Sequence, residues 1–226
     1  MYKLLANRLK ILLAERDLSI KDVVNATGLT RPSISNMVNN PFANISTENV
    51  DKLCNYLEVT ISQFYDYLPW HLSIGYSLRD RKLKFRHGEK FKVGYFLVKA
   101  SSGHKKTNTG FSIFLEAPTL NTNSPALIPG LIFSIQSPTN GSLDNLYNEM
   151  SPLFRHKLQG KILEVMKDFY IELNDEYNFA EIYQNSSSIK IYVDMYGTPK
   201  SYESNELFTG SFEYSFRTSN NDNKKS

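Results

Sequence analysis

Apolar residues recur at helical spacing through the first seventy positions of the chain. Leu5, Leu9, Leu12 and Leu13 predict an amphipathic helix over residues 3–16. The same spacing, with a Ser or Thr suited to cap each start, predicts four more helices that begin at Ser19, Thr30, Ser46 or Thr47, and Thr60, the last one ending near Leu68. Residues 1–69 are therefore expected to form a small bundle of five short helices.

Beyond Trp70 the pattern changes to alternation. Residues 81–86 and 90–99 alternate around His87-Gly88, which predicts a basic β-hairpin, and residues 100–110 are typical of an exposed loop. We expect further strands at 111–116, 127–136, 188–196 and 207–217, a short helix at 143–150 and a long one at 151–173. The expected fold is multidomain: the helical bundle, an α+β domain over 70–217 with an antiparallel sheet and one long helix, and a disordered tail over 218–226.

The net charge of +3 conceals an uneven distribution along the chain. Residues 1–70 hold seven basic and seven acidic residues, residues 71–110 hold ten and two, and residues 111–226 hold nine and fourteen. Attraction of the first seventy residues to phosphate must therefore depend on the placement of single charges, or on the adjoining basic segment. A single cysteine, Cys54, and the absence of long apolar runs predict a cytoplasmic protein with no membrane span.

The segment from Leu18 to Val38 carries the most specific pattern. One short helix ends at Gly28, Leu29 fills a tight turn, and a second helix opens at Thr30 with Pro32 in its first turn. Two short helices joined in this way are how small proteins place a helix end in the DNA major groove.

Residues 3–68 resemble the lambda-repressor-type (Cro/repressor, or xenobiotic-response-element) helix-turn-helix family. The resemblance rests on Leu18-Ser19, Thr27-Gly28-Leu29-Thr30, Ile34-Ser35 and residues 53–60. It implies a transcriptional regulator that binds double-stranded DNA. The chain departs from the family at Ile20, where glutamine is usual and often touches phosphate, and at Val24, where alanine is usual.

Side chains near the start of the second helix are expected to reach base edges. Arg31 can pair with guanine and Asn36 with adenine, and flanking polar residues are suited to phosphates. The predicted base contacts are Thr30, Arg31, Ser33, Ser35 and Asn36. The predicted phosphate contacts are Ser19, Lys21, Asn39, Asn40 and Asn44.

Each of these interpretations has an alternative. The bundle could bind a protein rather than DNA, since polar residues at helix starts are capping residues in most proteins. The basic hairpin over residues 79–92 could be a wing that contacts phosphates, or a solvated strand face whose charges deter aggregation. The long helix could support a core or a dimer seam.

The sequence shows no recognisable catalytic, metal or cofactor motif. Its four histidines, His71, His87, His104 and His156, lack the spacing of metal ligands, and no phosphate-binding glycine loop occurs. The segment that self-cleaving repressors use is missing around Ser134 and Ser137. We therefore expect no enzymatic activity, no metal and no cofactor.

These observations favour a sequence-specific repressor of phage or mobile-element type that binds an operator as a homodimer, because one module reads only a few base pairs. One alternative is a DNA-tethered sensor whose C-terminal domain binds a peptide or small molecule. Another is an autoregulating antitoxin-like or enzymatic protein, for which Asp194 or the group Glu172, Asp175 and Glu176 could supply a nuclease site.

Overall fold

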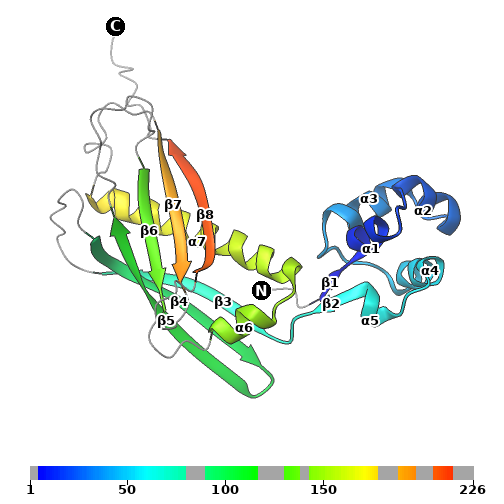
Figure 1. The fold of residues 1–226 in the computed structure, drawn as a ribbon, viewed down its shortest axis with the longest axis horizontal. Helices are drawn as coiled ribbons and strands as arrows, with labels where there is room; N and C mark the ends of the chain where they lie inside the picture. The colour runs from blue at the N-terminus through cyan, green and yellow to red at the C-terminus, as the bar shows by residue number, and fades with distance from the viewer. Residues whose placement is uncertain are drawn as a thin grey trace, which may run out of the picture. The chain divides into compact units, whose positions relative to one another are not determined.

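The computed structural model describes residues 5–79, 90–116, 130–137, 143–177, 188–196 and 206–215 (Figure 1). The chain divides into two compact units. The first consists of residues 1–73, 100–106 and 150–157, and the second of residues 74–99, 107–149 and 158–226. The expected hairpin residues 81–88 and the expected disordered tail at 218–226 lie outside the described residues.

Five helices occupy the N-terminal domain, and side chains define most of their starts. They are α1 (Leu9–Glu15), α2 (Ile20–Thr27), α3 (Arg31–Asn39), α4 (Thr47–Leu57) and α5 (Ile61–Phe64). Ser19, Thr30, Ser46 and Thr60 each accept a hydrogen bond from the backbone N–H three residues later. These bonds satisfy donors that a helix start leaves unpaired, so the predicted starts of α2 to α5 are confirmed.

The beginning and end of this domain differ from the prediction. The first helix starts at Leu9, because residues Leu5–Asn7 form strand β1, which pairs antiparallel with β2 (Tyr65–Tyr67). Asn7 ends the strand: its Oδ1 accepts the Leu9 N–H at 3.1 Å and its Nδ2 donates to the Pro41 carbonyl at 2.9 Å. α5 is a single turn that stops at Phe64, since the chain then enters β2.

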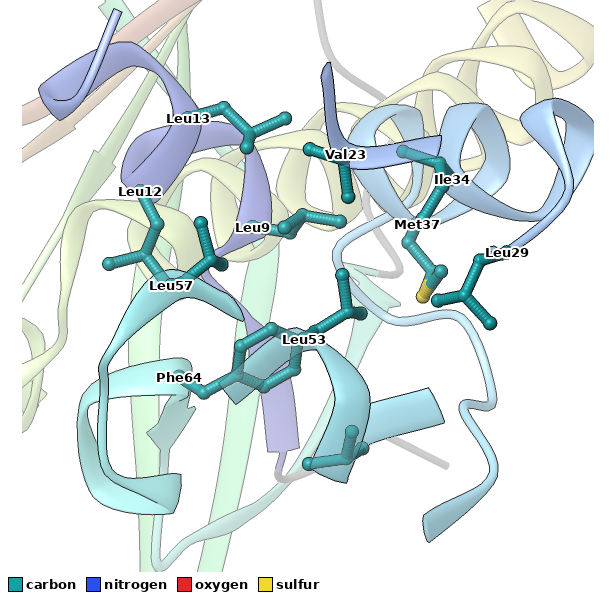
Figure 2. Packing of buried hydrophobic residues seen from close by; sticks show 11 residues of the cluster. Leu9, Leu12, Leu13, Val23, Leu29, Ile34, Met37, Leu53, Leu57 and Phe64 are labelled. Atoms are coloured by element: carbon teal, nitrogen blue, oxygen red, sulfur yellow. The ribbon is translucent and has the colours of Figure 1, made fainter. Parts of the chain in front are cut away.

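An aliphatic core holds the five helices together (Figure 2). Leu9, Ile34, Leu53 and Phe64 are completely buried and come from four different helices. Val24, where the family usually has alanine, is half-buried and packs at the edge of this cluster. The core fixes α2 and α3 against each other and leaves their outer faces to solvent.

A six-stranded sheet and two helices form the rest of the described chain. Its strands, in spatial as well as sequence order, are β3 (His71–Leu78), β4 (Lys90–Ser102), β5 (Lys105–Glu116), β6 (Gly130–Gln136), β7 (Ser188–Tyr196) and β8 (Glu206–Ser215). The predicted antiparallel sheet is wrong at one place, because β6 and β7 are parallel. Helices α6 (Leu143–Glu149) and α7 (Pro152–Tyr177) carry the chain back between them, as a parallel connection requires.

The predicted loop at residues 100–110 is also wrong. β4 continues to Ser102 and β5 begins at Lys105, so only Gly103 and His104 form the turn. Gly103 has a left-handed φ of +55°, which a two-residue hairpin turn accommodates most readily with glycine. The two strands continue through this polar stretch because backbone pairing depends little on side-chain polarity at the end of a hairpin.

Aromatic side chains fill the space between α7 and the sheet. Phe169 and Tyr170 on α7 are completely buried, and the ring of Phe133 on β6 meets each of them edge-on at 5.7 and 6.4 Å. A Cβ at Gly94 on β4 would lie 2.8 Å from the Phe169 ring, so this strand approaches the helix closely. The sheet therefore has one face covered by a helix (Figure 1).

Candidate nucleic-acid interface

The turn between α2 and α3 is fixed by local interactions. Gly28 has a φ of +70° and its N–H donates to the Val24 carbonyl, which ends α2. The Thr27 hydroxyl donates to the Val23 carbonyl at 2.7 Å and accepts the Leu29 N–H at 3.3 Å. Leu29 is buried in the core, so the turn cannot swing freely. From the sequence, Thr27 is recognised only as part of the helix-turn-helix motif. The structure shows that its hydroxyl links the end of α2 to the turn.

The outer face of α3 is polar. Ile34 and Met37 point into the core, and because successive helical residues are rotated by about 100°, the opposite side presents Pro32, Asn36 and Asn39. All three are exposed. The structure thus brings Asn36 and Asn39 to one open surface.

The remaining predicted base-contact residues surround this surface. Arg31, in the first turn of α3, is exposed, and Ser33 and Ser35 are half-buried at the flanks. The Thr30 hydroxyl accepts the Ser33 N–H at 3.4 Å, so this side chain serves the helix start. Arg31 has the longest side chain of this group, and it lies at the N-terminal end of α3.

Two of the predicted phosphate-contact side chains are engaged within the protein. Ser19 donates its hydroxyl to the Asp22 carboxylate at 2.6 Å and its N–H to the same oxygen at 2.9 Å. The side-chain bond from Ser19 is the main reason why the pKa of Asp22 is lowered. Asn40 accepts the Phe42 N–H through its side-chain oxygen at 3.1 Å. Phosphate contacts by Ser19 and Asn40 stay predictions, and the capping box with Asp22 is a local partner that the sequence analysis overlooked.

The carboxylate of Asp22 also affects what the start of α2 can bind. A helix start attracts anions through its free N–H groups and its positive dipole end. Here Asp22 already supplies a negative charge at that place. Lys21, Asn39 and Asn44, the other predicted phosphate contacts, are exposed.

The charges of the neutral N-terminal domain are not spread evenly. Arg8 and Arg16 lie 3.8 Å from Glu15, and Lys52 lies 2.7 Å from Glu48. Within the described part of the chain, Arg31 makes no such ion pair. Cations on α1 and α4 are thus partly neutralised, and the positive charge at the start of α3 is left available for a negative partner.

Outside α2 and α3, the titratable side chains of the described residues form no candidate metal site. Those residues contain no group of three or more His, Cys, Asp or Glu side chains able to hold a metal ion. Asp194 accepts the Thr209 hydroxyl at 3.1 Å, and Glu172 accepts the Tyr76 hydroxyl at 2.9 Å. Burial, followed by the charge of Asp51, raises the pKa of the Cys54 thiol, which keeps it in its unreactive protonated form.

The two capped helices α2 and α3, joined by a tight turn at Gly28 and Leu29, have the geometry of a helix-turn-helix. Residues 8–69 match the family of Cro/C1-type HTH DNA-binding domains. The N-terminal part of the chain is therefore a repressor-like helix-turn-helix domain, and the match supports a DNA-binding regulator. Neither a curated protein nor a solved structure gives a significant match. Within the described residues, no helix is long and apolar enough to cross a bilayer.

Proposed function

We propose that the protein is a sequence-specific transcriptional repressor of the phage or mobile-element type, related to the xenobiotic-response-element group. Its α3 helix enters the major groove of an operator. The observation that carries this proposal is the exposed polar face of α3, with Arg31 at its start, within a domain of Cro/C1 type.

The residues of α3 take different roles in this proposal. Arg31 reads guanine and Asn36 reads adenine, since each can form two hydrogen bonds with the major-groove edge of that base. Ser33 and Ser35 make shorter contacts at the flanks. Lys21, Asn39 and Asn44 hold the phosphate backbone on either side. Thr30 maintains the start of the helix and so positions Arg31.

A single helix-turn-helix reads too few base pairs for specific regulation, so we propose that the protein acts as a homodimer on two half-sites about 34 Å apart. Residues 70–217 then serve as the dimerisation or effector domain. The protein acts through binding rather than catalysis, in the cytoplasm, where its DNA target would lie.

The test begins with selection of genomic fragments by the purified full-length chain. With the selected operator, Arg31→Ala is expected to weaken binding by about 1–3 kcal/mol, which corresponds to roughly 5- to 150-fold. Arg16→Ala is the matched control, because it removes an exposed cation that lies beside Glu15 at the end of α1. Circular dichroism should show the same helical content in both variants.

Two results would overturn the proposal. Equal operator affinity for the Arg31→Ala variant and the parent would exclude Arg31 as a base contact and with it the assigned role of α3. A monomeric mass in the presence of operator DNA, measured by sedimentation at micromolar concentration, would exclude the dimer.

A further inference from the structure

A second surface suited to nucleic acid lies on the β4–β5 hairpin of the six-stranded sheet. Residues 90–115 contain five lysines and no acidic residue. The lysines are Lys90, Lys92, Lys99, Lys105 and Lys106, of which Lys92 is half-buried and the other four are exposed. This is a strong local excess of positive charge in a chain whose helix-turn-helix segment is neutral.

On the β5 side, the hairpin extends past its neighbour β6. β6 pairs with β5 only from Ser112 to Glu116, so the seven residues Lys105–Phe111 run beyond that pairing. At about 3.4 Å per residue, this stretch of β5 is roughly 24 Å long. β4 and β5 therefore form a long ribbon with a tight turn at Gly103-His104, in which β3 pairs with the other side of β4 and β5 continues beyond β6 (Figure 1).

The lysines of the ribbon fall into two groups. Near its base, Lys90 lies over the Phe114 ring at 5.3 Å and Lys92 lies over the Tyr95 ring at 4.2 Å. Near its tip, Lys99, Lys105 and Lys106 form no ion pair with any residue in the described ranges. Since neighbouring strand residues point to opposite faces, Lys105 and Lys106 give both faces of the tip a positive charge.

The composition of the tip limits what it can bind. A surface for single-stranded nucleic acid needs aromatic side chains on which bases stack, and a loop that inserts into a membrane needs large apolar side chains. Residues 99–110 contain no Phe, Tyr, Trp, Leu, Ile, Val or Met. Lysines among Ser, Thr, Asn and Gly are instead suited to phosphate oxygens on the outside of a duplex.

We propose that this tip, residues 99–106, binds the phosphate backbone of duplex DNA without reading its sequence. The inference rests on the proposed DNA-binding function and adds to it the source of the general electrostatic attraction. The helix-turn-helix domain supplies base recognition but has no net charge. The ribbon, tethered to it in the same chain, supplies cations whose binding releases counterions from DNA.

The test compares two full-length variants with equal charge loss. In one, Lys105 and Lys106 are changed to Gln; in the other, Lys161 and Lys167 on α7 are changed to Gln. Binding to the selected operator and to a random duplex is measured over a range of salt concentrations. On both duplexes, the tip variant is expected to make the fall of log binding constant with log salt shallower by about 2. Each phosphate contact contributes about −0.9 to this slope, and two contacts are lost.

The specificity ratio separates this role from base reading. The tip variant should weaken operator and random duplex by the same factor, whereas Arg31→Ala should weaken the operator selectively. Changing Lys105 and Lys106 to Arg should preserve the slope. The α7 variant should leave the slope unchanged.

The inference is overturned if the tip variant has the parent slope, or if both charge-matched variants change it equally. It is likewise overturned if the tip variant keeps its DNA binding and loses only binding to anionic vesicles. Failure of the parent chain to bind any duplex would instead overturn the proposed function, so the two failures are distinguishable.

Discussion

The helical domain and the sheet domain are stabilised by different kinds of interactions. In the described part of the helical domain, four of five helices start with a capping side chain, and the core is aliphatic apart from the fully buried ring of Phe64. In the sheet domain the core is aromatic and its contacts join distant segments, as when Phe133 of β6 meets Phe169 of α7. The first domain is specified mainly by neighbours in sequence and the second mainly by neighbours in space.

The difference bears on function as well as on stability. The proposed reading surface lies on a helix whose start, turn and core face are all encoded within about twenty residues, from Ser19 to Asn39. The basic ribbon exists only because β4 and β5 are long strands and β5 continues beyond its pairing with β6. The proposed base recognition therefore has a local origin, whereas the proposed phosphate contact depends on the sheet.

The largest expected effect comes from removing a core side chain in either domain. Phe169→Ala should cost about 3–5 kcal/mol and Ile34→Ala about 2–5 kcal/mol, because each leaves a cavity at a completely buried site. Hydrogen exchange followed by mass spectrometry should show faster exchange in β6, β7 and α7 for the first variant and in α2–α4 for the second. If exchange increased across the whole chain in both variants, the two domains would not be stabilised separately.

Two glycines sharpen the role of long-range packing. A Cβ at Gly94 would lie 2.5 Å from the Ser77 carbonyl oxygen and 2.8 Å from the Phe169 ring. Gly94→Ala should therefore lower the free energy of unfolding by about 1–3 kcal/mol. At Gly160, within α7, a Cβ meets nothing within 4 Å, so Gly160→Ala should raise stability by about 0.5–1 kcal/mol. Urea unfolding measures both, and loss of stability in both would show that α7 requires glycine for another reason.

A substitution of the capping residue Thr30 tests whether local interactions set the start of α3. Thr30→Ala should lower the free energy of unfolding by about 1 kcal/mol, because the Ser33 N–H loses its acceptor. Thr30→Ser retains the hydroxyl and is the control. Thermal unfolding monitored by circular dichroism compares the two. Equal stability of the alanine variant and the parent would mean that the core alone sets the start of α3.

The smallest effect is expected at high pH in the sheet domain. Burial first, and then a hydrogen bond to Glu172, raises the pKa of Tyr76 to about 12. The folded state thus favours the protonated phenol, so its contribution to stability is complete below about pH 10 and is lost between about pH 10 and 12. The difference in unfolding free energy between the parent and Tyr76→Phe should shrink over that range. A difference that does not depend on pH would contradict the raised pKa.

Much of the candidate site could be predicted from local spacing. The burial of Ile34 and Met37 and the exposure of Asn36 follow from helical periodicity, and Gly28 ends α2 as its type and position indicated. The involvement of Ser19 with Asp22 could have been recognised from their separation of three residues, which is the spacing of a capping box. The bonds of Asn7 to the segment around Pro41 could not, because they join positions more than thirty residues apart.

The sequence by itself determined the helix-turn-helix, since caps, turn residues and a 3.6-residue repeat act within a few residues and need no knowledge of distant partners. Only the tertiary structure decided that Leu5–Asn7 pairs with Tyr65–Tyr67, that β6 and β7 run parallel, and that a polar stretch closes a long ribbon. Strand pairing depends on which backbones meet, and alternation specifies a strand without specifying its neighbour.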